Sequence, residues 1–328
     1  MSNDQKLARA VDVVCLGETM GQFVPADGRG VEDADSFSLQ HAGAESNVAI
    51  GLARLGFQTA WSSRLGNDAI GRRVLSAVKR ENVDTSLVAT MDDRPTGIFL
   101  KDPGLSGSSV SYYRRGSAAS HIDRSDVDRA LGASPRIIHF SGVTPALSVS
   151  CDDAVGYGVA AARGLDVTTS FDVNYRSALW VGRESAAARL AELANASDIV
   201  FVGLDEASSL WQVETAEEVR RILPGAGTLV VKDSALRATS FDGETTMVPA
   251  LRMDVVESVG AGDAFAAGWL AAFLGGRTPS IALRFGHLLA GAALASFSDQ
   301  GEPVSATAIE QLANDEAMWA AHEGPAPL

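Results

Sequence analysis

The sequence predicts an α/β protein, a three-layer α/β/α sandwich with a mostly parallel central sheet and a small β-strand lid. From residue 136 onward, short apolar segments alternate with helical ones, which is typical of a parallel sheet covered by helices on both faces. The alternation consists of predicted strands 137–141, 167–172, 199–202 and 229–231, with predicted helices 152–163, 185–195 and 216–223 between them.

The N-terminal part of the chain supplies a second and a third observation. Residues 11–17 form a short apolar run that ends in glycine, which predicts a central first strand. The strand-like segments 96–101 and 109–114 flank a glycine- and serine-rich turn and interrupt the alternation, so we expect a hairpin outside the main sheet. Together with strand-like patches near residues 22–24 and 36–39, this hairpin predicts the lid.

The other segments are expected to complete one domain over residues 1–328, with lid strands inserted at about 20–40 and 96–115. Apolar periodicity and cap residues predict the remaining elements. These are strands 59–63 and 253–256, helices 48–56, 68–80, 264–274, 281–297 and 308–320, and a disordered tail at 323–328.

Composition excludes several classes of protein. The chain has 328 residues, is 46% hydrophobic and carries a formal net charge of −14, which argues against a general binder of nucleic acid or anionic membranes. Cys15 lies in an apolar strand pattern and is expected in the core; with Cys151 it shows no spacing typical of a zinc site or a disulfide scaffold. His41 and His139 show no metal-ligand spacing either and are interpreted as ordinary polar positions. No signal peptide or membrane-spanning run is visible, so we expect a soluble cytoplasmic protein.

The stretch from Glu257 to Phe265 organises the candidate chemistry. Gly260 and Gly262 lie where a strand-like segment turns into an alanine-rich helix, and free N–H groups at a helix start favour anionic oxygens. A carboxylate beside an anion site suggests that Asp263 takes a proton from a hydroxyl that attacks a phosphoryl group. The alternative is that Asp263 only caps the helix.

Two separated segments resemble the two signature regions of the ribokinase-like (PfkB) family of carbohydrate kinases. One is 43–71, and the other is 257–270 around Gly-Ala-Gly-Asp. The matching points in the first segment are Gly43, Asn47, Ala49, Leu52, Leu55, Gly56, Gly66, Asn67 and Asp68. Both matches occur in the family's order and lie far apart, so the resemblance extends over nearly the whole chain and implies a ribokinase-like fold.

Within that family, three segments resemble 2-keto-3-deoxygluconate kinases. They are 43–47, 112–120 and 171–180. The segment 171–180 is also similar to fructokinases, so 112–120, which begins Tyr-Tyr-Arg-Arg, is the better marker. The resemblance implies ATP-dependent phosphorylation of a primary hydroxyl of a sugar acid, with 2-keto-3-deoxygluconate converted to its 6-phosphate.

The resemblance also assigns catalytic roles. It makes Asp263 the general base and the backbone N–H groups of Gly260, Ala261 and Gly262 the anion hole for the transferred phosphate. Arg114 and Arg176 are expected to bind the substrate carboxylate, because a guanidinium fork matches a carboxylate. Alternatively, Arg114 is a solvated charge at a strand end, and Arg176 faces the nucleotide phosphates or lies on the surface.

Further substrate-binding residues follow from the resemblance. They are Gly43, Asn47, Phe99, Tyr112 and Asp299. Glycine allows close approach of a ligand, and an asparagine amide both donates and accepts hydrogen bonds. Each polar or aromatic member also has a structural alternative: Asn47 as a helix cap, Tyr112 as a core aromatic of the lid, and Asp299 as a turn former.

The nucleotide side is expected to bind ATP with Mg²⁺. The cofactor-binding residues that the resemblance implies are Asn174, Arg176, Lys232, Ser234, Gly260, Ala261, Gly262 and His287. Glu206 resembles a glutamate that holds magnesium through water, with phosphates and water as the other ligands. The chain departs from the family pattern at Gly203, at Glu257, at His287 and in the missing glycines of 232–236.

Other functions remain as alternatives. The same signatures fit a fructokinase, a ribokinase or a nucleoside kinase, and a non-catalytic sugar-acid sensor would keep the fold without needing Asp263. A dinucleotide-binding oxidoreductase is disfavoured, because no G-x-G-x-x-G follows the first strand. The expected partners are a small sugar or sugar acid and ATP, with no nucleic acid or membrane. We also expect a homo-oligomer built through the lid, whose exposed strands need covering.

Overall fold

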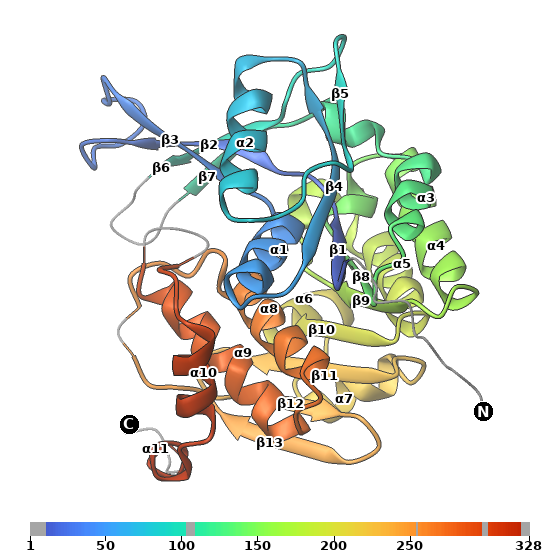
Figure 1. The fold of residues 1–328 in the computed structure, drawn as a ribbon, viewed down its shortest axis with the longest axis vertical. Coiled ribbons are helices and arrows are strands. Elements are labelled where there is room, and N and C mark those ends of the chain that lie inside the picture. Colours follow the sequence, from blue (N-terminus) through green and yellow to red (C-terminus); the bar gives the residue numbers. More distant parts are fainter. Residues whose placement is uncertain (1–10, 103–108, 254, 297–300, 323–328) are drawn as a thin grey trace, which may run out of the picture.

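The computed structural model describes residues 11–102, 109–253, 255–296 and 301–322. Its main sheet has nine strands in the order β13-β12-β11-β10-β9-β8-β1-β4-β5 (Figure 1). All pairings from β5 to β11 are parallel, and β12 and β13 extend that edge as antiparallel strands. The strands are β1 (Val13–Leu16), β4 (Thr59–Gly66), β5 (Val88–Met91), β8 (Ile137–Ser141), β9 (Thr168–Asp172), β10 (Ile199–Gly203), β11 (Thr228–Asp233), β12 (Arg237–Phe241) and β13 (Thr245–Pro249).

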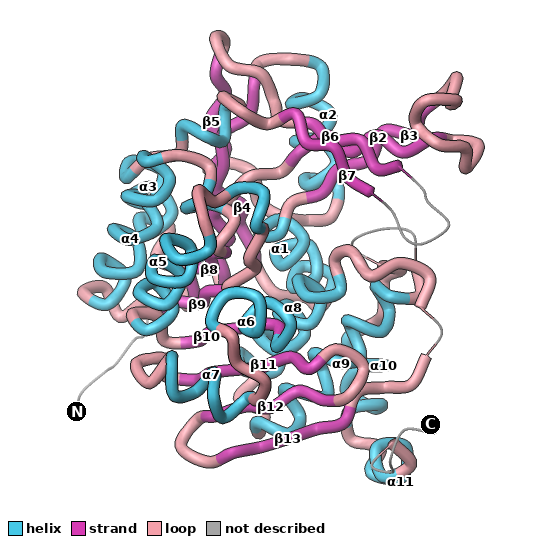
Figure 2. The backbone as a smooth tube through the Cα atoms, turned by 180° about the vertical axis from the view of Figure 1, so that it is seen from behind, coloured by secondary structure: helices cyan, strands magenta, loops and turns pink. Residues whose placement is uncertain are grey.

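Helices cover both faces of this sheet, which confirms the predicted three-layer sandwich (Figure 2). One face packs mainly against α1 (Ala44–Arg54), α2 (Ala69–Arg80), α8 (Ala261–Leu274), α9 (Pro279–Leu294) and α10 (Ala306–Ala313). The other packs against α3 (Arg124–Gly132), α4 (Val149–Arg163), α5 (Arg183–Asn195), α6 (Leu204–Trp211) and α7 (Ala216–Ile222). The short helix α11 (Glu316–Ala320) follows α10.

Strand β1 is apolar at every position because both of its faces are buried. Val13 and Cys15 lie in one hydrophobic core, and Val14 and Leu16 lie in the other. Successive side chains of a strand point to opposite faces, so a strand with helices on both sides needs apolar residues at every position. The predicted burial of Cys15 is confirmed, since the residue has no exposed surface.

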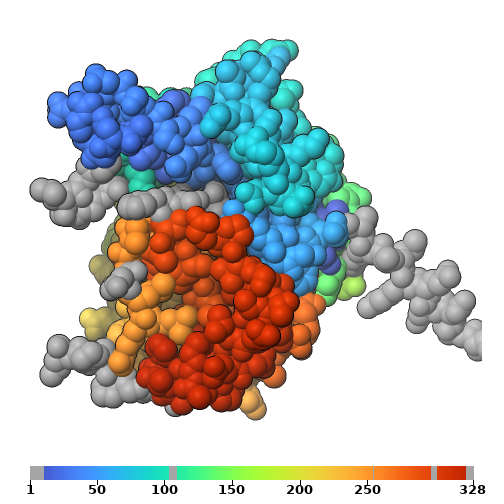
Figure 3. Space-filling view, turned by 60° about the vertical axis from the view of Figure 1, so that its left-hand side comes forward, coloured from blue at the N-terminus to red at the C-terminus, as the bar shows by residue number. Residues whose placement is uncertain are grey.

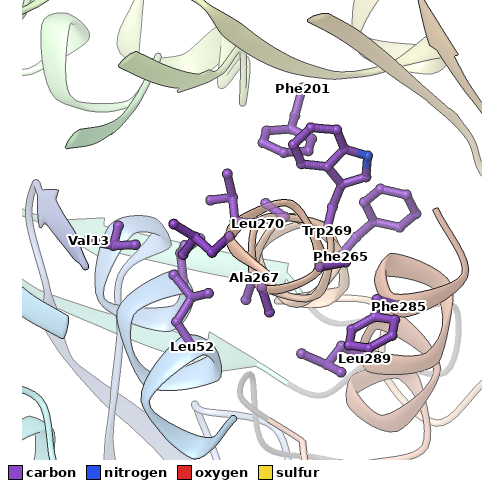
Figure 4. Close-up of a cluster of buried hydrophobic side chains, with 14 of the residues drawn as sticks. Val13, Leu52, Phe201, Phe265, Ala267, Trp269, Leu270, Phe285 and Leu289 are labelled. Atoms are coloured by element: carbon purple, nitrogen blue, oxygen red, sulfur yellow. The ribbon is translucent and has the colours of Figure 1, made fainter. Parts of the chain in front are cut away.

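Helix α8 is apolar on all sides because other elements surround it. Figure 4 shows Phe265, Ala267 and Trp269 pointing in different directions from this helix. Phe201 packs edge-on against Trp269 with ring centroids 5.4 Å apart, while α1 and α9 pack on other sides of the helix. The packing fixes the direction of α8, and therefore the position of its N-terminus.

A second, four-stranded sheet forms the predicted lid. Its strands are β2 (Met20–Pro25), β3 (Phe37–Ala42), β6 (Ile98–Asp102) and β7 (Ser109–Tyr113), in the order β3-β2-β6-β7. In its register, Gln22 pairs with Phe99, and Phe99 pairs with Tyr112. These three residues therefore share one face of the lid.

Several predicted elements differ from the structure. The predicted strand 253–256 is wrong for its described residues, because the N–H groups of Val256 and Glu257 donate to the carbonyl of Leu294 rather than to a strand. The predicted helix 308–320 is two helices, since Asn314 ends α10 and the side chain of Asp315 caps α11. The predicted helix 281–297 ends at Leu294.

Five strands and α-helices of the structure were not predicted, and two predictions concern residues outside the described ranges. Strands β5, β12 and β13 and helices α3 and α6 were not predicted from the sequence. The predicted tail 323–328 and Asp299 lie outside the described residues. Within the described ranges, no helix has the length and apolar character needed to cross a membrane.

Candidate active site

A cavity of about 1430 Å³ opens between the lid and the carboxyl-end edge of the main sheet. It is lined by residues from the ends of β9, β10 and β11, from the N-termini of α1 and α8, and from the lid strands. In Figure 3 the lid, in blue, stands above the red C-terminal helices. Of the residues predicted to form the site, those lining the cavity are Gly43, Asn47, Phe99, Tyr112, Arg114, Asn174, Arg176, Glu206, Lys232, Ser234, Gly260, Ala261, Gly262, Asp263 and His287.

The start of α8 faces this cavity. Gly260 has φ of +84°, a left-handed conformation that side chains rarely adopt, and the 14-residue helix begins at the next residue. A Cβ atom on Gly262 would lie 3.4 Å from Nζ of Lys232, so the ammonium group stands close to this turn. N–H groups at a helix start and a nearby cation make the turn suitable for a phosphate.

Asp263 is buried in the first turn of α8. Its carboxylate accepts hydrogen bonds from Nδ2 of Asn47 at 2.9 Å and from Nδ2 of Asn174 at 3.3 Å, rather than from backbone N–H groups of its own helix. Burial raises the pKa of Asp263 to about 7, with a further rise from Asp172, although the Asn47 hydrogen bond lowers it. A carboxylate with this pKa can exchange a proton near neutral pH.

The N-terminus of α1 places Asn47 opposite Asp263. Gly43 is the N-cap of this helix, so Asn47 lies inside the first turn and the structural alternative of a helix cap is wrong. A Cβ atom on Gly43 would lie 2.3 Å from the carbonyl oxygen of Glu18, so only glycine fits against the β1–β2 connection. Close backbone packing here holds Asn47 in reach of α8.

Four charged groups lie on the other side of Asp263. Lys232 Nζ is 3.0 Å from Asp172 Oδ2, and the NH1 group of Arg176 is 3.5 Å from Oε1 of Glu206. Burial lowers the pKa of Lys232, but Asp172 and Glu206 outweigh burial and raise it above its usual value. Burial, followed by the charge of Asp172, raises the pKa of Glu206. Asp172 was not among the predicted site residues.

Arg114 lies under the lid and is paired with Glu18. Its Nε donates to Oε2 of Glu18 at 2.6 Å, and its NH2 group forms an ion pair with the same carboxylate. Ser117 donates to Oε1 of Glu18 at 2.5 Å. The side chain of Arg114 is only 9% exposed, so the alternative of a solvated strand-end charge is wrong. Glu18 lines the cavity and was missed, although it directly follows the first strand.

The lid contributes a mixed polar and aromatic wall. Phe99 and Tyr112 have ring centroids 5.6 Å apart, and Tyr112 is 45% exposed, so it is not a core aromatic. Gln22 also lines the cavity, and its side-chain Oε1 and Nε2 are both buried without a hydrogen-bond partner among the described residues. Gln22 was not among the predicted site residues.

The opposite end of the cavity is apolar. His287 is buried there; its Nε2 lies 3.3 Å from the carbonyl of Val248, its ring packs edge-on against Phe265, and burial lowers its pKa to about 4. Exposed apolar side chains surround this end: Leu236, Met247, Met253, Val255 and Val259.

His139 was predicted to be an ordinary polar position, but it is a core residue. It is buried beside Ser170, and burial lowers its pKa to about 4.

The family assignment follows from comparison with known proteins. The family model described as "pfkB family carbohydrate kinase" matches residues 10–305. The chain belongs to the PfkB family of carbohydrate kinases. This PfkB protein is therefore an enzyme, a phosphotransferase that uses an alcohol group as acceptor, which confirms the resemblance found in the two signature segments.

Similar proteins with more specific names include two curated relatives. This PfkB protein is 34% identical to the 2-dehydro-3-deoxygluconokinase of Bacillus subtilis (strain 168), over 85% of this chain and 88% of the relative. It is 29% identical to the 2-dehydro-3-deoxygalactonokinase of Haloferax volcanii, over 84% and 88%. Among solved structures, a PfkB protein from Polaromonas sp. JS666 is 35% identical, with a TM-score of 0.82 over 89% of this chain and 98% of that one.

Proposed function

We propose that this PfkB enzyme transfers the γ-phosphoryl group of ATP to the terminal hydroxyl of 2-keto-3-deoxygluconate, the compound also called 2-dehydro-3-deoxygluconate. The observation that carries the kinase chemistry is the position of Asp263, a buried carboxylate with a pKa of about 7 at the start of α8. Sugar-acid specificity is supported by the similarity to the 2-dehydro-3-deoxygluconokinase of Bacillus subtilis and by the guanidinium of Arg114 in the cavity wall.

In the proposed mechanism, Asp263 acts as the general base. An acceptor hydroxyl within hydrogen-bond reach of its carboxylate gives up its proton as the oxygen attacks the γ-phosphorus, and the bond to ADP breaks. The N–H groups of Gly260, Ala261 and Gly262 hold the transferred phosphate, and Lys232 offsets its charge. Asn47 and Asn174 orient the carboxylate through their amides.

The donor site is proposed at the apolar end of the cavity. The side chains of Leu236, Met247 and Val255 offer a surface for a purine, and the neutral imidazole of His287 lies nearby. Arg176 is half exposed and lies beside Glu206, which favours the role on the phosphate side over the carboxylate clamp. Asn174 and Ser234 also line the cavity, and both have positive φ angles. We assign them to the donor side.

In this arrangement, Glu206 would hold a magnesium ion through water. Mg²⁺ prefers oxygen ligands and keeps several waters. Glu206 lies next to Asp172, and no group of three or more His, Cys, Asp or Glu that could hold a metal occurs in the described part of the chain. The ion would therefore take most of its ligands from phosphates and water, and it would offset negative charge on the transferred group.

The acceptor site is proposed under the lid. Gly43, Phe99 and Tyr112 would contact the sugar chain, with Asp299 as a further candidate outside the described residues. Gln22 extends this set, because its amide has no partner among the described residues and can both donate and accept hydrogen bonds. Glu18 engages Nε and NH2 of Arg114, so the other edge of the guanidinium is left for a carboxylate.

The test is an ADP-release assay with ATP and Mg²⁺ against a panel of acceptors. The panel contains 2-keto-3-deoxygluconate, its galactonate epimer, fructose, ribose and adenosine. We expect the highest kcat/KM with 2-keto-3-deoxygluconate. A higher value with a neutral sugar would exclude the sugar-acid assignment and leave the kinase chemistry intact, and no turnover with any acceptor would favour the sensor alternative.

We also propose that the enzyme assembles through the lid. β3 and β7 are the edge strands of the lid, and exposed residues on them include Phe37 and Tyr113. Unpaired strand edges of this kind are suited to pairing with a second copy. Light scattering after size-exclusion chromatography tests this, and a monomer at all concentrations would exclude it.

A further inference from the structure

An ion pair connects the lid directly to the loop that precedes the anion hole. Nζ of Lys101, on lid strand β6, lies 2.5 Å from Oε2 of Glu257. The side chains are 6% and 13% exposed, so the contact is shielded from solvent on both sides. The kinase mechanism above makes no use of either residue.

Glu257 shapes the loop that leads into α8. Its other oxygen, Oε1, accepts hydrogen bonds from the backbone N–H groups of Ser258 at 2.9 Å and Val259 at 3.3 Å. These N–H groups directly precede Gly260, whose left-handed conformation starts the anion hole. The carboxylate therefore fixes the backbone of this loop on one side and contacts the lid on the other.

Lys101 belongs to the cavity face of the lid. It lies two residues after Phe99 on the same strand, so both side chains point to the same face, and both line the cavity. An uncompensated carboxylate at the position of Glu257 would repel the phosphates that the neighbouring turn is suited to bind. Lys101, which belongs to the lid, offsets part of that charge.

We propose that Lys101 and Glu257 are positioning residues whose ion pair joins the lid to the anion-hole loop, so that the loop takes its phosphate-binding form when the lid is closed. This inference rests on the proposed kinase function. It predicts that the geometry of the anion hole depends on a residue of the lid that contacts no phosphate.

The first experiment needs no substrate. Hydrogen–deuterium exchange of the ligand-free full chain is compared between wild type and Lys101→Met, with the backbone N–H groups of 258–262 as the readout. We expect about tenfold faster exchange in this segment, because a buried ion pair that loses one partner is strongly destabilised. Arg124→Met is the matched control, since Arg124 pairs with Asp153 at an exposed site. Unchanged exchange at 258–262 would overturn the inference.

The second experiment is a double-mutant cycle on kcat/KM for ATP. Lys101→Met and Glu257→Gln are each expected to lower it about tenfold, and the double variant should lose little more, because the two residues act through one contact. The KM of the sugar acceptor should change less. Lys101→Arg should restore most of the activity, whereas Glu257→Asp, whose side chain is one methylene shorter, should not.

Different results of these experiments would count against the positioning role of Lys101 and Glu257 and against the proposed kinase function. A large loss in Lys101→Met together with normal activity in Glu257→Gln would make Lys101 a phosphate contact and overturn the positioning role. Additive losses in the cycle would overturn it as well. A wild-type protein that phosphorylates none of the acceptors would count against the proposed function, while the exchange experiment would still decide whether lid and loop are joined.

Discussion

The amide nitrogen of Asn47 lies 2.9 Å from Oδ2 of Asp263 and joins the first turn of α1 to the first turn of α8. Each residue belongs to one of the two signature segments, which lie far apart in the sequence. The hydrogen bond lowers the pKa of Asp263 against the opposing effect of burial. Asn47 therefore lowers the pH at which the proposed base becomes ionised, against the larger effect of burial.

This relationship predicts a shift in the pH profile of Asn47→Ala. The base must be ionised to accept a proton, so the kcat/KM of wild type should rise with pH through about 7 and then level off. Loss of the hydrogen bond raises the pKa of Asp263, so the inflection should move to higher pH. At pH 6 we expect up to about tenfold lower activity relative to wild type, with a smaller difference at pH 9.

The pH dependence of kcat/KM between pH 5 and 10 checks this prediction. Asn314→Ala is the control, because Asn314 also places an amide near a carboxylate, that of Glu310, but at an exposed site. An unchanged inflection in Asn47→Ala would show that another group determines the profile.

Asp263→Asn should separate catalysis from binding and stability. Loss of the base should lower kcat by about 10²- to 10⁴-fold, while the affinity for the acceptor, measured by calorimetry, changes little. A parallel loss of affinity would indicate that Asp263 acts in binding instead.

The same substitution should stabilise the protein at neutral and alkaline pH. The pKa of Asp263 is raised in the folded protein to about 7, so wild type loses stability as pH rises from about 4 through 7. Asparagine cannot ionise, so the variant should gain stability over that range and keep the gain above it, by at most about 4 kcal/mol. Urea unfolding at pH 4 and pH 8 measures this, and an equal stability difference at both values would contradict it.

The central parallel strands β1, β8, β9 and β10 were predicted from the sequence because they are largely buried on both faces, whereas β5, which is partly buried or exposed, was not. The uninterrupted apolar runs of β1 and β10 reflect this burial. Strands β12 and β13 lie at the edge, where Arg237 and Thr245 are exposed, and their mixed polarity resembles that of loops. Val255 and Val256 misled in the opposite direction, since they are apolar but exposed, and Val255 lines the cavity.

Some site residues could be predicted from a local sequence motif, whereas others are brought to the site only by the fold. Gly260, Gly262 and Asp263 were found because glycines and an acid at a strand-to-helix turn suggest phosphate chemistry, and because the other signature segment, 43–71, favoured that role over a helix cap. Glu18 and Gln22 have no such local pattern, and their positions in the cavity depend on how the lid folds over the sheet. The pairing of Arg114 with Glu18 joins residues 96 positions apart, and neither residue indicates the other in the sequence.

That pairing predicts different results for single and double variants of Arg114. Arg114→Met leaves the fully buried carboxylate of Glu18 without its cation, which should cost about 3–5 kcal/mol of stability. Glu18→Gln combined with Arg114→Met should recover most of the loss, as measured by urea unfolding. Equal stability of the two variants would show that the buried pair is not coupled.

The stable double variant then tests the carboxylate contact. If Arg114 binds the acid group, the double variant should lose about tenfold or more in kcat/KM for 2-keto-3-deoxygluconate and much less for a neutral sugar. Glu18→Gln alone is the control, because it keeps the guanidinium. Equal losses for acid and neutral acceptors would remove Arg114 from the proposed acceptor site.

Gln22→Leu should weaken acceptor binding without a loss of stability. The amide of Gln22 is buried without a partner among the described residues, so replacing it with an apolar side chain of similar size removes an unpaired polar group and should leave the melting temperature unchanged or higher. If the amide bonds to the sugar, the KM of the acceptor should rise about tenfold while kcat changes little. Gln40→Leu is the matched control, because Gln40 pairs with Gln22 across the lid but is exposed and does not line the cavity. A variant that melts lower and keeps its acceptor KM would show that Gln22 serves the packing of the lid instead.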